Sequence, residues 1–188
     1  MLRSEMREDF IPLKSEMFQM CLSLYAYKTK YEAFPNRFPK ATRHFLLEEA
    51  TALRALSNEI ILHLCKLDED KSKVSFHAAK KVLSKSKLSA TEQSSLNSKL
   101  KAFRSSINTL KTVHRNRYIA HLTEDGYPNL FDLPSFEEGY QQVAQTAYET
   151  FAFIWGDDVT FRFKVGSQEA IIIFNTELGL SEVVEEHT

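Results

Sequence analysis

The stretch SATEQSSLNSKLKAFRSSINTL, residues 89–110, decides how this chain folds. Ser89 and Glu92 match a capping box, in which each side chain accepts a hydrogen bond from the backbone N–H of the other residue. Apolar residues then recur in steps of four, three, four and three: Leu96, Leu100, Phe103, Ile107 and Leu110. Such spacing places a single apolar stripe along a helix. The stretch therefore predicts a long helix that buries one face against other helices.

Helical spacing of apolar residues extends to both sides of this stretch. Four further helices are predicted, over residues 9–33, 42–67, 75–83 and 135–156. The first is broken by Phe-Pro-Asn-Arg-Phe-Pro at 34–39, because proline ends helices. The central helix is expected to continue through residues 115–121 and to stop before Gly126.

The last thirty residues change period. Val159, Phe161, Phe163 and Val165 alternate with polar residues, residues 169–175 are rich in Ile and Phe, and Gly166-Ser167 lies between the two runs. This pattern predicts a β-hairpin packed on the helices, followed by a frayed tail after Gly179. The expected fold is mainly all-α: an antiparallel up-and-down bundle of four to five helices over 1–156, with a small C-terminal hairpin in an extension over 157–188.

Composition narrows the class of protein. Hydrophobic residues make up 43% and charged residues 26% of the 188, as in ordinary globular domains. There is no apolar run near the roughly 20 residues needed to cross a bilayer, and no signal-peptide pattern at the N-terminus. Cys21 and Cys65 lie in apolar helical patterns and are expected to be buried free thiols. We therefore expect a soluble cytoplasmic protein without a membrane partner, a bound metal or a cofactor.

Charge is distributed unevenly along the chain. Residues 1–70 hold 10 Lys/Arg and 11 Asp/Glu, residues 71–123 hold 12 and 1, and residues 124–188 hold 2 and 13. Two interpretations remain open. The basic middle third could form a face that attracts polyphosphate, or it could pack beside the acidic C-terminal third.

The basic third contains the segment whose residue types could carry out catalysis, Arg-Asn-Arg-Tyr-Ile-Ala-His at 115–121. Arg115 and Arg117 could hold a phosphate and stabilise charge that develops on it. His121 could take a proton from a ribose 2′-hydroxyl or give one to a leaving 5′-oxygen. These residue types suffice for metal-free RNA cleavage, although Arg117 and His121 could also be solvated neighbours near the end of a helix.

This segment resembles the R-x(4–6)-H signature of the HEPN superfamily (higher eukaryote and prokaryote nucleotide-binding domains). Arg115 matches the arginine, Asn116 the polar residue that commonly follows it, and His121 the histidine. The surrounding residues, 40–155, are similar to the AbiU-type branch of this superfamily, which is associated with abortive infection. The resemblance implies a helical bundle that forms a homodimer, with the Arg and His of both subunits facing one cleft.

It also implies a function. Many members of the superfamily are metal-independent endoribonucleases that serve as toxins or phage-defence effectors, some with a nucleotidyltransferase-like antitoxin. Others are non-catalytic modules that bind a nucleotide or a protein, and this remains the alternative. The predicted catalytic residues are Arg115 and His121, with Asn116 and Arg117 in support; His114 is the weakest candidate.

Helix geometry complicates this assignment. At about 100° per residue, Arg115 and His121 lie roughly 120° apart around an ideal helix, whereas Arg117 and His121 differ by about 40°. Either the helix distorts, or a second subunit completes the site, or Arg117 has the larger role. Elsewhere, Glu59 and His63 have a spacing compatible with metal ligation but lack a third ligand, so we expect an ordinary polar contact. Trp155 is expected to be a core or interface anchor.

Overall fold

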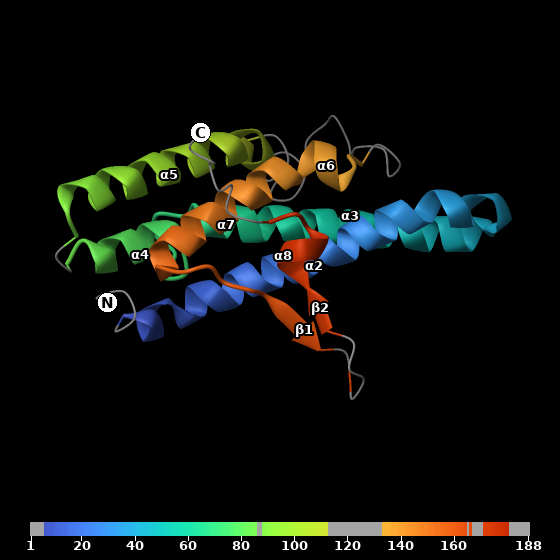
Figure 1. Cartoon of the computed structure of the whole chain (residues 1–188). Coiled ribbons are helices and arrows are strands. Elements are labelled where there is room, and N and C mark those ends of the chain that lie inside the picture. Colours follow the sequence, from blue (N-terminus) through green and yellow to red (C-terminus); the bar gives the residue numbers. More distant parts are fainter. Residues whose placement is uncertain (1–5, 86–87, 113–132, 165, 167–170, 181–188) are drawn as a thin grey trace, which may run out of the picture.

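The computed structural model describes residues 6–85, 88–112, 133–164, 166 and 171–180. These residues form a mainly helical structure with one small antiparallel sheet, as the sequence predicts (Figure 1). In chain order the elements are η1 (Arg7–Phe10), α2 (Ile11–Arg37), η2 (Phe38–Lys40), α3 (Arg43–Leu67), α4 (Phe76–Leu83), α5 (Ala90–Thr109), α6 (Phe136–Gly139), α7 (Gln141–Trp155), β1 (Arg162–Lys164), β2 (Ile171–Ile173) and α8 (Phe174–Glu177).

Helices α2 and α3 pack along one another as an antiparallel hairpin. The helix α3 begins where predicted, because the Thr42 side chain accepts a hydrogen bond from the backbone N–H of Phe45. The helix α2 differs at both ends. It starts at Ile11 rather than at residue 9, which lies in a preceding 3-10 turn, and it continues through Pro35 to Arg37. Pro35 lies in the last turn of the helix, which ends two residues later.

The helix α5 confirms the prediction from residues 89–110. Ser89 and Glu92 form both hydrogen bonds of the capping box. Leu96, Leu100, Phe103 and Ile107 are buried, and α5 packs on α7 through this stripe. Ser75 likewise caps α4, through the backbone N–H of Ala78.

The predicted fifth helix is two helices. Ser135 and Glu138 form a capping box at the start of α6, but Tyr140 leaves the helical conformation with φ −130° before α7 begins. The Tyr140 hydroxyl lies 2.6 Å from the Ser57 hydroxyl in the core, and its ring meets the Tyr27 ring edge-on. Gly139 is required here because a Cβ would lie 2.6 Å from Pro134 Cγ. Burial of Tyr140 thus bends the chain at a point where local sequence favours one helix.

The C-terminal hairpin is shorter than predicted and pairs Arg162 with Ile173 and Lys164 with Ile171. The side chain of Asn175 extends the pairing, since it accepts from the Phe161 N–H and donates to the Val159 carbonyl. The rings of Phe163 and Phe174 face Phe18 on α2, which holds the hairpin against that helix.

Burial agrees with the apolar patterns of the sequence. Cys21 and Cys65 are buried and outside any disulfide, and burial raises the pKa of the Cys21 thiol to about 12. Trp155 is almost fully buried, with the Lys14 ammonium 4.8 Å from its ring centre. None of the helices in the described ranges is long and apolar enough to cross a membrane.

Candidate functional site at the end of α5

The residues with predicted catalytic roles, Arg115, Asn116, Arg117 and His121, lie outside the described residues, as does His114. What the structure describes is the helix that leads to them. After Thr109, residues 110–112 continue α5 as a π-helical turn. Single π-helical turns are rare and occur frequently at functional sites. The π-helical turn therefore lies shortly before residues 115–121, in which an ideal helix would place Arg115 and His121 on different faces.

A polar cluster around Asp68 holds this end of α5. The Asp68 carboxylate follows the last turn of α3 and is almost fully buried, with 2% of the side chain exposed. Arg104 donates through Nε to its Oδ1 at 2.9 Å, and Lys111 donates through Nζ to its Oδ2 at 3.1 Å. Arg104 and Lys111 both extend from the α5 segment, so the cluster ties this segment to the end of α3. Lys111 is four residues before Arg115.

His77, at the start of α4, completes the cluster. Its Nε2 lies 2.8 Å from Arg104 Nη2 and 3.1 Å from Asp68 Oδ1. Because a guanidinium only donates, Nε2 accepts from Arg104 when the ring proton is on Nδ1, which faces Asp70 at 3.5 Å. When both ring nitrogens carry protons, Nε2 donates to Asp68 instead. The ring is held by the cluster in either state.

Charge in the cluster is compensated by hydrogen bonds. Burial alone would raise the pKa of the Asp68 carboxyl, but hydrogen bonds from His77 (with Nε2 protonated), Arg104 and Lys111 outweigh this effect and hold that pKa below its ordinary value. The same contact raises the pKa of Arg104. Asp68 is therefore an ionised anchor, and its side chain is only 2% exposed to solvent.

The lysines of the basic third behave differently. Lys71, Lys73, Lys81, Lys85 and Lys101 are exposed. Within the ranges that the structure describes, no ion pair joins a base of residues 71–112 to an acid of residues 133–180. Two described acids of the C-terminal third pair instead with the first third: Asp157 with Arg7 and Glu137 with Lys28. In the described residues the basic third thus packs on α7 through apolar side chains rather than through charge.

A second buried cluster lies between α2 and α3. Glu16 accepts from His63 Nδ1 at 2.7 Å and from Lys66, while Glu59 is 3.7 Å from His63 Nε2. Lys66 and His63 share the Glu16 carboxylate, so His63 makes ordinary polar contacts, as expected. Among the described residues no group of three or more His, Cys, Asp or Glu could hold a metal ion.

Sequence reasoning missed the roles of Asp68 and Glu16 in these clusters, although a signal was present. Glu16 follows Leu13 by three residues and precedes Met20 by four, and Asp68 follows Leu64 by four. An acid at this spacing lies on the apolar stripe of its helix and must find a partner when buried.

Comparison with protein-family models, with curated proteins and with solved structures found no match for this chain.

Proposed function

We propose that this chain is a metal-independent endoribonuclease of the HEPN type. It would act as a cytoplasmic homodimer and serve as a toxin or phage-defence effector, with a nucleotidyltransferase-like antitoxin as its cognate partner. The substrate is RNA, and the reaction is attack of a ribose 2′-oxygen on the adjacent phosphorus.

The observation that carries the proposal is the unpaired charge of the exposed lysines in the basic third. Exposed lysines at 71–101 have no acidic partner in the described part of the chain, and the sequence continues from them into Arg115–His121. Cations without partners attract the phosphates of a nucleic acid and release its counterions on binding. Had these lysines been paired with the acidic third, the charge pattern would have had a purely structural cause.

Each predicted residue has a defined role in the reaction. The 2′-oxygen bonds to phosphorus while the bond from phosphorus to the 5′-oxygen breaks, which leaves a 2′,3′-cyclic phosphate and a free 5′-hydroxyl. His121 takes the 2′-hydroxyl proton, and a second histidine, His121 of the partner subunit, gives a proton to the 5′-oxygen. Arg115 stabilises the negative charge on the oxygens bound to phosphorus, and Asn116 and Arg117 orient the phosphate. The Asp68 cluster fixes the direction of the helix that enters the segment, through Lys111.

The test is RNA cleavage by the purified protein in EDTA. We expect 2′,3′-cyclic phosphate ends, and a loss of rate of about 10²–10⁴-fold in His121→Ala. His114→Ala is the matched control, since it removes a neighbouring histidine and should retain activity. Binding of RNA without turnover, with His121→Ala changing only affinity, would favour the non-catalytic nucleotide- or protein-binding module. An intact RNA in every condition, together with harmless overexpression, would remove the ribonuclease proposal.

A further inference from the structure

The hairpin of α2 and α3 ends in an arm that extends past the other elements in Figure 1. We name the arm tip as residues 31–53, from the last turns of α2 through η2 to the first half of α3. An apolar pocket of about 450 Å³ opens there. Its lining residues are Tyr31, Phe34, Pro35, Phe38, Leu46, Ala50, Leu53 and Leu133.

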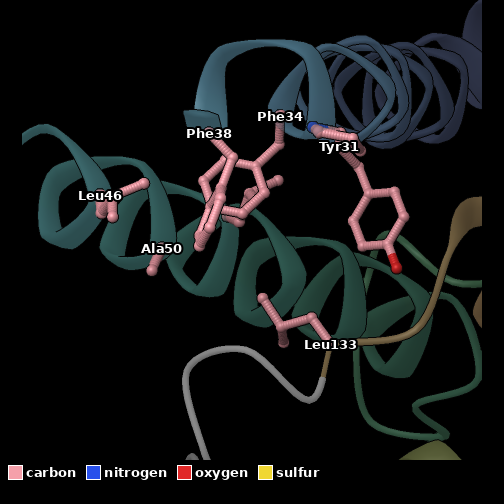
Figure 2. Close-up of a pocket in the computed structure, with 8 residues that line it drawn as sticks. Tyr31, Phe34, Phe38, Leu46, Ala50 and Leu133 are labelled. Atoms are coloured by element: carbon pink, nitrogen blue, oxygen red, sulfur yellow. The ribbon is translucent and has the colours of Figure 1, made fainter. Parts of the chain in front are cut away.

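Aromatic rings form one wall of this pocket. Figure 2 shows the rings of Phe34 and Phe38 together over α3, with Leu133 across the hollow. The two ring centroids are 5.8 Å apart in an edge-to-face arrangement. Phe38 is half exposed, at 50%, so this face of its ring is available to a ligand. Half-exposed aromatic rings beside a cavity suit a flat, aromatic ligand group.

Three cations lie in the same stretch of the arm tip as the residues that line the pocket. From Ala33 to Leu47 the chain has Arg37, Lys40 and Arg43 and no acid, and all three cations are exposed. None of them forms an ion pair with a described residue, whereas the acid nearest in sequence on the buried side, Glu49, is paired with Lys30 at 2.6 Å. Residues 33–47 of the arm tip therefore have net positive charge without an ion-pair partner among the described residues, while Glu32, Glu48 and Glu49 lie on either side of this stretch.

The start of α3 places part of this positive charge where it is unfavourable for the helix. Anions are favoured at a helix N-terminus, yet the first turn of α3 has no acid and begins with Arg43 and His44. The Thr42 side chain satisfies one backbone N–H of this turn, and others have no partner within a helix. Cations at the positive end of a helix repel the helix dipole, and a bound phosphate would relieve that repulsion.

We infer that the arm tip binds single-stranded nucleic acid, with an unpaired base in the aromatic pocket and the flanking phosphates on Arg37, Lys40 and Arg43. Stacking platforms combined with a cationic track are how proteins hold single strands without reading sequence. The inference rests on the proposed function for the choice of ligand, because a ribonuclease that acts on unpaired RNA needs a surface that holds the strand outside the cleavage site.

The experiment measures binding of a fluorescent single-stranded oligothymidylate of about fifteen nucleotides by anisotropy. A deoxy strand lacks the 2′-hydroxyl and stays intact, so failure of strand binding and failure of RNA cleavage are observed separately. We expect Phe38→Ala to lower the affinity for this strand roughly tenfold. The unaltered protein should bind an abasic strand of equal length with a similarly lowered affinity. Leu62→Ala is the matched control, because Leu62 is a similarly exposed apolar residue, 47%, further along α3.

The charge contribution is tested by salt dependence. In Lys40→Gln/Arg43→Gln the slope of log affinity against log salt should fall by about 0.7 for each phosphate that the variant no longer binds. The control, Arg162→Gln/Lys164→Gln, removes two exposed cations from β1 and should keep the slope. Equal effects of the two double variants, or wild-type binding by Phe38→Ala, would overturn the inference. So would a dimer that dissociates in Phe38→Ala, since a second copy of the chain would then be the occupant of the pocket.

Discussion

Each end of α3 has a charge of unfavourable sign for the helix dipole, but only the charge at the C-terminal end has ion-pair partners among the described residues. At its C-terminal end Asp68 places a negative charge at the negative pole of the helix, and at its N-terminal end Arg43 places a positive charge at the positive pole. Asp68 is buried and bound by Arg104 and Lys111, both distant in sequence. Arg43 is exposed and forms no ion pair with a described residue.

This difference distinguishes a cluster that holds the fold together from a surface whose cations have no ion-pair partner among the described residues. A charge compensated inside the protein is unavailable to a ligand, and removing one partner of such a pair destabilises the fold. A charge left without compensation costs some stability and is available for binding. Within α3, the first case marks the end that holds the α5 segment, and the second marks the arm tip.

The largest contrast should come from the aromatic rings at the two ends. Phe103 is fully buried against Phe76 beside the Asp68 cluster, whereas Phe38 is half exposed. We expect Phe103→Ala to lower the free energy of unfolding by about 3–5 kcal/mol, and Phe38→Ala by less than about 0.5 kcal/mol. Urea denaturation followed by circular dichroism measures both values. A large loss in Phe38→Ala would mean that the arm tip belongs to the folding core.

Charge removal should produce a smaller contrast of the same kind. Asp68→Asn leaves Lys111 without a carboxylate and leaves the half-exposed Arg104 with Asp70 alone, at 3.2 Å, and we expect a loss of about 1–3 kcal/mol at pH 7. Glu48→Gln removes an exposed acid near the other end of α3 and should change stability by less than about 0.5 kcal/mol.

The loss in Asp68→Asn should depend on pH. Because the pKa of Asp68 is lower in the folded than in the unfolded protein, its contribution is present above the unfolded pKa of about 4 and disappears as pH falls through the folded pKa. Unfolding curves of both proteins at pH 7, 4 and about 2.5 should therefore converge at the acid end. A constant difference across this range would show that the carboxylate charge is not what stabilises this cluster.

The smallest effect should have the opposite sign. Arg43→Glu replaces the cation at the positive pole of α3 with an acid, so we expect a gain of roughly 0.3–1 kcal/mol at low salt that shrinks at high salt. Arg37→Glu is the control, because Arg37 lies in the last turn of α2, where a cation is favourable, and its replacement should destabilise. Thermal melts at two salt concentrations distinguish the two. A loss of stability in Arg43→Glu would mean that Arg43 has a partner and that the two ends of α3 are alike.

Local features of this chain were accessible from the sequence because their partners are a few residues apart. Each capping box joins residues three apart, and each apolar stripe repeats within a turn, so the starts of α3, α4, α5 and α6 and the burial of Leu96 to Ile107 were predicted correctly. The change to alternation after residue 156 likewise predicted the hairpin. The assignment of Arg115 and His121 remains a prediction from the sequence.

Tertiary structure alone decided what depends on distant partners. Ser57 and Tyr140, 83 positions apart, interrupt the predicted fifth helix, because burying the Tyr140 hydroxyl requires a hydrogen-bond partner that the local sequence does not provide. Arg104 meets Asp68 across 36 positions, and His63 meets Glu16 across 47. Only the packed chain shows which charges find a partner and which, as at the arm tip, stay open to a ligand.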